Sequence, residues 1–142
     1  MKHCNKALLS FAICLFVLVA SSCATTNNKK IDYYSSEKNY VEVTGIINHV
    51  VFDEEQQILY LGFSDLSKEL DDDCFKIVGN SYYIVSNTDK DLIQIGKTAT
   101  FVTAPKYFGD GYVMPIVSLT IDDITILKYD VGLSGYLDWL KK

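Results

Sequence analysis

The chain has 142 residues, of which 49% are hydrophobic, and its 18 acidic and 13 basic residues give a formal net charge of −5. Every basic residue is a lysine, so the chain lacks the forked guanidinium group that suits phosphates and base edges. This composition argues against nucleic acid as a partner, and the length suits one small domain with short appendages.

The first 23 residues look like a targeting segment. Lys2 and Lys6 precede an uncharged, mostly apolar run over residues 7–20, which is shorter than the roughly 20 residues of a membrane-spanning helix. The ending Val19-Ala20-Ser21-Ser22-Cys23 resembles the lipobox of bacterial lipoproteins, although Ala20 stands where that family usually has leucine. The alternative is an ordinary cleaved signal followed by an incidental cysteine.

The resemblance implies a lipid anchor. Residues 1–22 would be a removable signal peptide, and the thiol of Cys23 would carry the lipid that holds the protein to a membrane. Two or three acyl chains are enough for stable anchoring. The resemblance therefore implies a protein on the bacterial cell membrane or outer membrane, with its domain outside the cytoplasm.

Residues 24–39 are polar and show no helical or strand period. We therefore expect residues 23–39 to form the lipid anchor and a flexible tether, and residues 40–142 to form one domain. Without the signal, 11 lysines face 18 acidic residues, a formal charge of −7 that favours a basic partner through long-range attraction.

Cys74 is the one cysteine left once the signal is removed and Cys23 is acylated. We interpret it as a small buried residue at the start of a strand, the alternative being a thiol that reacts or pairs with another chain. His49 is the single histidine after the signal, and nothing near it indicates a poised thiolate–imidazole pair. We interpret His49 as a structural residue.

Short apolar segments separated by turn-forming residues begin at residue 40. The pattern predicts a strand over residues 41–52 with a bulge or bend at Gly45, a turn over 53–56 and a return strand over 58–63. We expect a short helical turn over residues 64–73, capped by Ser64.

The next segments are also read as strands. Residues 74–78 and 82–85 have strand composition and flank a Gly-Asn-Ser turn. A further strand is expected over 97–104, ended by Pro105. Residues 113–121 form the return strand, with Pro115 suited to an edge or a bulge.

The end of the chain predicts one more strand and a helix. Asp122-Asp123 breaks the preceding strand, and residues 124–127 form a short one. Four apolar residues then recur at helical spacing, and we expect them to pack on the domain: Leu133, Tyr136, Leu137 and Leu140.

This order of elements resembles the oligonucleotide/oligosaccharide-binding (OB) fold. The resemblance depends on Val43-Thr44-Gly45, Ile95-Gly96-Lys97 and the hairpin over residues 107–116. It implies a mainly β protein, a small OB-like barrel of five to six strands with a short C-terminal helix. A small β-sandwich, or a half-open sheet covered by the helix, is the alternative.

Three aromatic residues surround the Gly109-Asp110-Gly111 turn and are the candidate ligand or partner contacts: Tyr107, Phe108 and Tyr112. In OB-like barrels the ligand face is flanked by the first and last hairpin loops, here residues 52–57 and 106–112. The alternative is that these rings cover the open end of the barrel.

The chain carries no motif for a metal or a cofactor, and we expect neither. Five acidic residues lie between two predicted strands: Asp65, Glu69, Asp71, Asp72 and Asp73. Their spacing differs from that of an EF-hand loop, so we interpret them as a solvated acidic loop.

These features predict a membrane-anchored envelope lipoprotein whose OB-like domain binds a protein, peptide or glycan and has no enzymatic activity. The alternative is a small envelope hydrolase that uses loop carboxylates, for which Asp53, Glu54, Glu55 and Asp110 are available. A glycoside hydrolase would need two carboxyl groups that face each other across a cleft.

Overall fold

The computed structural model describes residues 27–88, 90–106 and 113–142. The chain divides into two compact units, Met1–Tyr33 and Tyr34–Lys142. Residues 27–34 are helical, although the sequence shows no helical period there. The second unit therefore begins six residues before the β-rich segment and contains all the strands described below.

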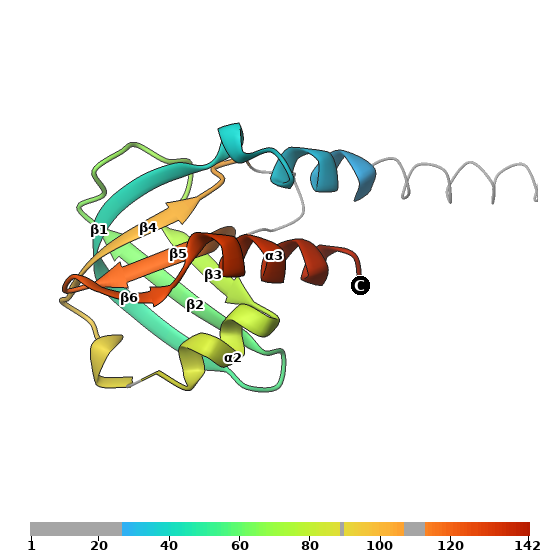
Figure 1. The fold of residues 1–142 in the computed structure, drawn as a ribbon. Helices are drawn as coiled ribbons and strands as arrows, with labels where there is room; N and C mark the ends of the chain where they lie inside the picture. The colour runs from blue at the N-terminus through green and yellow to red at the C-terminus, as the bar shows by residue number, and fades with distance from the viewer. Residues whose placement is uncertain (1–26, 89, 107–112) are drawn as a thin grey trace, which may run out of the picture. The chain divides into compact units, whose positions relative to one another are not determined.

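In the described part of the chain, six strands, two short α-helices and two 3-10 turns follow Tyr34 (Figure 1). The strands are β1 (Val41–Asp53), β2 (Ile58–Ser64), β3 (Cys74–Val78), β4 (Thr98–Thr103), β5 (Met114–Ile121) and β6 (Ile124–Leu127). A 3-10 turn, η1 (Glu37–Asn39), precedes β1. Helix α2 (Asn80–Ser86) and the 3-10 turn η2 (Lys90–Leu92) lie between β3 and β4, and α3 (Tyr129–Leu140) ends the chain.

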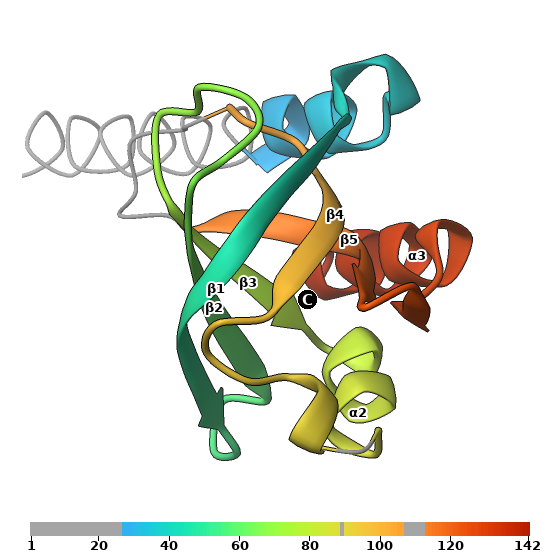
Figure 2. The ribbon, with the colours of Figure 1, turned by 90° about the vertical axis from the view of Figure 1, so that its left-hand side faces the viewer.

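Five of the strands close into a barrel. The N-terminal half of β1 pairs with β4 and its C-terminal half pairs with β2, so this long, curved strand belongs to both sides (Figure 2). β3 pairs antiparallel with β2 and parallel with β5, and β4 pairs with β5, which completes the circuit. The predicted mainly β, OB-like barrel with a C-terminal helix is confirmed, and β6 extends it beside β5.

Aromatic and branched side chains fill the barrel because alternate residues of each strand point inward. The rings of Phe63 and Phe101 stack at 4.3 Å between centroids, and Phe75 meets both edge-on. Leu59 and Leu61, which share a face with Phe63 at the two-residue period of β2, are fully buried in the same cluster. The opposite faces of β1, β2 and β3 therefore point out of the barrel.

The irregularity of β1 lies at a different residue from the one predicted. Pairing with β4 runs evenly through Gly45, whereas pairing with β2 shifts between Ile47 and His49, which makes Asn48 the extra residue. Gly45 is needed for another reason: an added Cβ would lie 2.9 Å from Leu66 Cδ2. The prediction of a bulge at Gly45 was wrong because a strand glycine also marks close packing.

Two local predictions between β2 and β4 were wrong. Residues 65–73 form an irregular segment without a helix, in which Leu66 and Leu70 still pack against the core. Residues 82–85, expected as a strand, lie within α2. Their aromatic and β-branched composition favours a strand, but burial of Tyr82 and Val85 three residues apart favours a helix that covers the barrel end.

The C-terminal helix forms where predicted but turns a different face to the barrel. Its buried residues are Gly132, Gly135 and Tyr136, while Leu133 and Leu137 are half-buried. An added Cβ on Gly132 would overlap the carbonyl oxygen of Val117 in β5. Of the four residues predicted to pack on the domain, Tyr136 is buried, but Leu133, Leu137 and Leu140 are only half-buried, because glycines let the helix backbone approach the sheet more closely than leucines do.

The segment before β1 packs on the same helix. Tyr34 is buried, and its ring meets that of Tyr136 edge-on at 5.0 Å. The Tyr34 hydroxyl donates a hydrogen bond to the carbonyl of Lys106 (3.3 Å), and the Tyr40 hydroxyl donates one to the carbonyl of Tyr34 (2.9 Å). These bonds connect the entry to β1 with the segment that follows β4.

Candidate binding surface

The predicted contact residues Tyr107, Phe108 and Tyr112 lie outside the described residues, as does Asp110. The strands that carry this connection are described. β4 ends at Thr103, before Pro105 as expected, and β5 begins at Met114. Pro115 lies in β5 just beyond the ladder with β4, at the parallel junction with β3 that closes the barrel.

The two loops expected to flank a ligand face are attached at opposite ends of β1. Thr103, at the end of β4, pairs with Val41, whereas the β1–β2 turn follows Asp53. The surface that extends between these ends is the outward face of β1, β2 and β3. Its residues alternate with the core residues of the same strands.

One row of this outward face is apolar and aromatic. Val51 pairs with Tyr60, which pairs with Lys76. The Val51 side chain is 42% exposed and Tyr60 is half-buried, while Lys76 is only 5% exposed because α3 covers it. The Lys76 ammonium lies 4.6 Å from the centre of the Trp139 ring, a cation–π contact that joins β3 to the end of α3.

The neighbouring row contains His49, Gly62 and Cys74. Gly62 is required there, because an added Cβ would lie 2.6 Å from Asn48 Oδ1 and 2.8 Å from His49 Cβ. His49 is exposed and Cys74 is half-buried, each on a different neighbour of β2.

The Cys74 thiol is held in its neutral form. Its pKa is raised by burial first and then by the Asp72 and Asp73 carboxylates, against the opposing effect of the Phe75 backbone N–H. A raised pKa lowers the fraction of nucleophilic thiolate. The surroundings of Cys74 therefore favour a packing role over a reactive one.

The acidic segment before β3 uses its carboxylates to shape the backbone. Asp72 Oδ1 accepts hydrogen bonds from the N–H groups of Asp73 (2.8 Å) and Cys74 (3.1 Å), and the Asp73 carbonyl accepts one from the Phe63 N–H (2.9 Å). Within residues 27–88, 90–106 and 113–142, no group of three or more acidic, histidine or cysteine side chains could hold a metal ion.

The carboxylates of the β1–β2 turn also differ in role. Asp53 Oδ1 accepts a hydrogen bond from the Gln56 N–H (2.9 Å), which stabilises the turn. Glu54 and Glu55 are exposed. Asp53, one of the acidic residues available to the hydrolase alternative, thus already accepts a backbone hydrogen bond.

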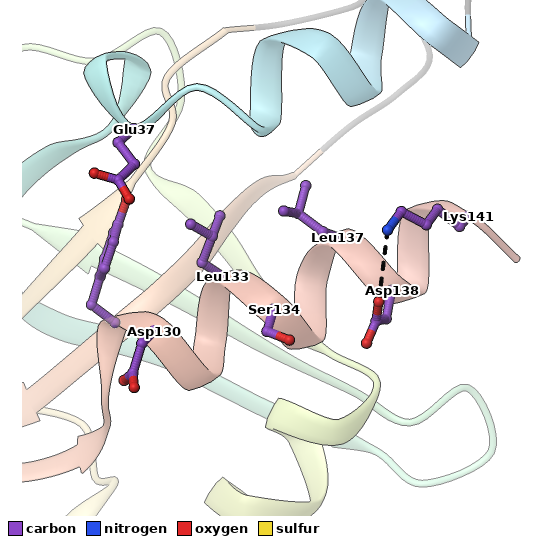
Figure 3. A pocket seen from close by; sticks show the side chains of 8 residues that line it. Glu37, Asp130, Leu133, Ser134, Leu137, Asp138 and Lys141 are labelled. Carbon is purple, nitrogen blue, oxygen red and sulfur yellow. Dashed lines mark ion pairs between the residues drawn. The ribbon is translucent and has the colours of Figure 1, made fainter.

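A concave region of about 400 Å³ runs along α3 (Figure 3). Leu133 and Leu137 project on the same side of the helix, the side on which Glu37 lies. Asp138 lies on the other side, with its carboxylate 3.9 Å from the Lys141 ammonium. Two of the leucines predicted to pack on the domain thus line an open region and are only half-buried.

Comparison with known proteins finds no matching family model, no matching curated protein and no matching solved structure. Among the described residues, no helix has the length and apolar character needed to cross a membrane. The geometry and the sequence are therefore the basis for a functional proposal.

Sequence reasoning missed Val51, Tyr60, Lys76 and Trp139 as a shared surface. One signal was available, because the inward period of Leu59, Leu61 and Phe63 requires Tyr60 to point outward. The partners of Tyr60 on β1 and β3 depend on strand register, which the sequence alone does not define.

Proposed function

We propose that this protein is a membrane-anchored envelope lipoprotein whose OB-like barrel is a non-enzymatic binding or adaptor module for a protein, peptide or glycan. The observation that carries the binding function is the outward row formed by Val51 and Tyr60, extended by Trp139 above Lys76. An exposed aliphatic side chain beside half-buried aromatic rings suits recognition of an extended ligand along the strands.

Two further observations support this assignment. In OB-like barrels, ligands bind on the face of the second and third strands, which is where Tyr60 and Lys76 lie. The sequence before the barrel ends its apolar run at a lipobox-like Cys23, which suits a domain held near a membrane. Hydrolysis is less well supported, since the Asp53 carboxylate accepts a backbone hydrogen bond of its own turn.

The binding function is tested by capture. The full chain, solubilised in detergent, is used to retrieve partners from solubilised envelope, and Tyr60→Ser is compared with Ile124→Ser. Ile124 is 48% exposed on β6, whose partner among the described strands is β5, so it is a matched apolar control on a different strand from the face. Partner retrieval should fall with Tyr60→Ser alone; equal retrieval by both variants would refute this face.

The anchor is tested separately. We expect Cys23→Ala to abolish incorporation of a fatty-acid analogue, because the lipobox thiol is the proposed attachment point. Metabolic labelling followed by gel fluorescence measures the incorporation, with Cys74→Ala as the matched cysteine control. Labelling that persists in Cys23→Ala would contradict lipidation at this residue, whatever the outcome of the capture experiment.

A further inference from the structure

A pocket of about 300 Å³ lies between the β1–β2 turn and α2, and its lining residues are different from those of the outward row proposed above. Its lining residues are Phe52, Glu54, Gln57, Tyr82, Tyr83 and Ser86. Figures 1 and 2 both place the turn and α2 at the same end of the barrel. This volume is at the small end of ligand sites, so it suits a single side-chain head group.

The pocket has an aromatic wall. The Tyr82 ring meets Phe52 at 6.4 Å and Tyr83 at 5.8 Å between centroids, with tilts of 62° and 71°. Tyr82 is only 5% exposed, whereas Tyr83 is 44% exposed at the rim. Electron-rich faces of tyrosine rings attract cations, and more strongly where water is excluded.

The remaining lining groups are oxygen acceptors held by local structure. The Asp53–Gln56 hydrogen bond defines the turn, and Gln57 ends it with a left-handed φ of 58°, which places Glu54 and Gln57 on a fixed backbone. Ser86 Oγ donates to the Tyr83 carbonyl at 3.2 Å and thus keeps lone pairs for an incoming donor.

The pocket is also electrically negative. Glu54 supplies a carboxylate, and none of the lysines that the structure describes lines the pocket. The pKa of Tyr82 is raised by burial first and then by the Glu54 and Asp53 carboxylates. Both carboxylates therefore act on the aromatic wall, and no lining cation offsets them.

We propose that this pocket binds the side-chain ammonium of a lysine presented by a protein or peptide partner. The inference rests on the proposed binding function and specifies the chemistry of its partner. A primary ammonium brings three N–H donors for the carboxylate, amide and hydroxyl oxygens, and a positive charge for the tyrosine rings. A quaternary ammonium has no N–H donor, and a neutral sugar has no charge.

The test is a titration of the full chain in detergent micelles, followed through its backbone amide NMR signals. The probe is Nα-acetyl-lysine N-methylamide, and the comparison probes are the norleucine analogue, tetramethylammonium and methyl glucoside. We expect saturable shifts at residues 52–57 and 80–86 with the lysine probe alone. No saturable shift there, or equally tight binding of any comparison probe, would overturn the proposal.

Two turn variants sharpen the result. Glu54→Gln should weaken binding of the lysine probe about tenfold, as expected for loss of one charged hydrogen bond. Glu55→Gln removes the same charge from a neighbouring exposed residue that does not line the pocket, so it should leave affinity unchanged. Equal weakening by both variants would overturn a specific site in favour of general attraction.

A rim variant tests the aromatic wall without disturbing the core. Tyr83→Leu keeps an apolar side chain at an exposed position and should weaken the lysine probe roughly threefold, since exposed cation–π contacts are modest. Unchanged affinity would show that Tyr83 is not part of the lysine site. If the full chain fails to bind the lysine probe but still captures a partner in a Tyr60-dependent way, this pocket alone is refuted. If the chain binds the lysine probe but its partner capture does not depend on Tyr60, the outward face alone is refuted.

Discussion

The two long sides of α3 are buried to different degrees, and the side that carries the leucines is the less buried one. The side formed by Gly132, Gly135 and Tyr136 is buried, whereas the side formed by Leu133 and Leu137 lines an open concave region (Figure 3). The difference shows that backbone proximity, rather than the amount of apolar surface, decides which face of this helix meets the barrel.

The glycine side is in contact with two different elements. Gly132 lies against the backbone of Val117 in β5, and Gly135 lies against Ser81 in α2. Each glycine removes the side chain that would separate the helix from its neighbour, so the Tyr136 ring can reach Tyr34.

The largest effect is expected from Gly132→Ala. The new methyl group would overlap the Val117 carbonyl oxygen, and neither backbone can move without shifting a whole element. We expect the free energy of unfolding to fall by about 3 kcal/mol, at the upper end for overpacking, despite the better helix propensity of alanine. Urea denaturation measures it, and an unchanged midpoint would show that glycines do not position α3.

A smaller loss is expected from Gly135→Ala, because its new Cβ would lie 2.5 Å from a side-chain atom, Ser81 Oγ. We expect a fall in unfolding free energy of about 1 to 2 kcal/mol. Ser81→Ala should restore most of it, since the buried Ser81 hydroxyl has no hydrogen-bond partner among the described residues and its removal is nearly neutral.

The pair forms a double-mutant cycle that thermal melting can follow. A coupling energy near zero between Gly135→Ala and Ser81→Ala would contradict the steric explanation. The loss of unfolding free energy in Gly135→Ala would then come from the helix backbone.

These same residues show why the fold was easier to predict than the packing. The strands follow from alternation and from turns such as Asp122-Asp123, whose φ values of 48° and 63° suit a tight hairpin. The barrel end was misread at Tyr82 and Val85, because strand composition and a buried helical face use the same residue types. The face of α3 depends on what Gly132 meets, which is a property of the partner strand.

The candidate sites were less predictable for the same reason. Val51, Tyr60 and Lys76 come together only through strand register. Likewise, Glu54 and Tyr83 both line one pocket, although two strands and an irregular segment separate them in sequence. The sequence indicates aromatic contacts at the one turn with an obvious motif, whereas the described part of the chain offers Tyr60, half-buried on a strand, and Tyr83, exposed on a helix.

The leucine side should respond weakly. We expect Leu133→Ser or Leu137→Ser to lower the unfolding free energy by less than about 1 kcal/mol, because both side chains are only half-buried. The comparison variant is Tyr136→Ala, for which truncation of a buried ring should cost about 3 kcal/mol. A loss for Leu137→Ser as large as that for Tyr136→Ala would place the main contact of α3 on the leucine side.

The smallest effect is expected at the start of the leucine side, where Tyr129 lies close to Glu37. The pKa of Tyr129 is raised above 10.0, by burial first and then by the Glu37 carboxylate. The folded protein therefore holds this phenolic proton more tightly than the unfolded chain does. The stability that Tyr129 contributes is complete below its pKa in the unfolded chain. It is lost as the pH rises from there through its pKa in the folded protein.

Glu37→Gln should bring the Tyr129 pKa closer to its ordinary value without restoring it fully, because burial is the larger cause. Ultraviolet titration of phenolate absorbance, with Tyr129→Phe subtracted to isolate this ring, measures the change. Lys38→Gln, a charge change at the neighbouring residue, should leave the pKa of Tyr129 unchanged. If both variants changed the pKa of Tyr129 equally, that pKa would depend on the net charge of the segment. Glu37 would then have no particular contact with the open side of α3.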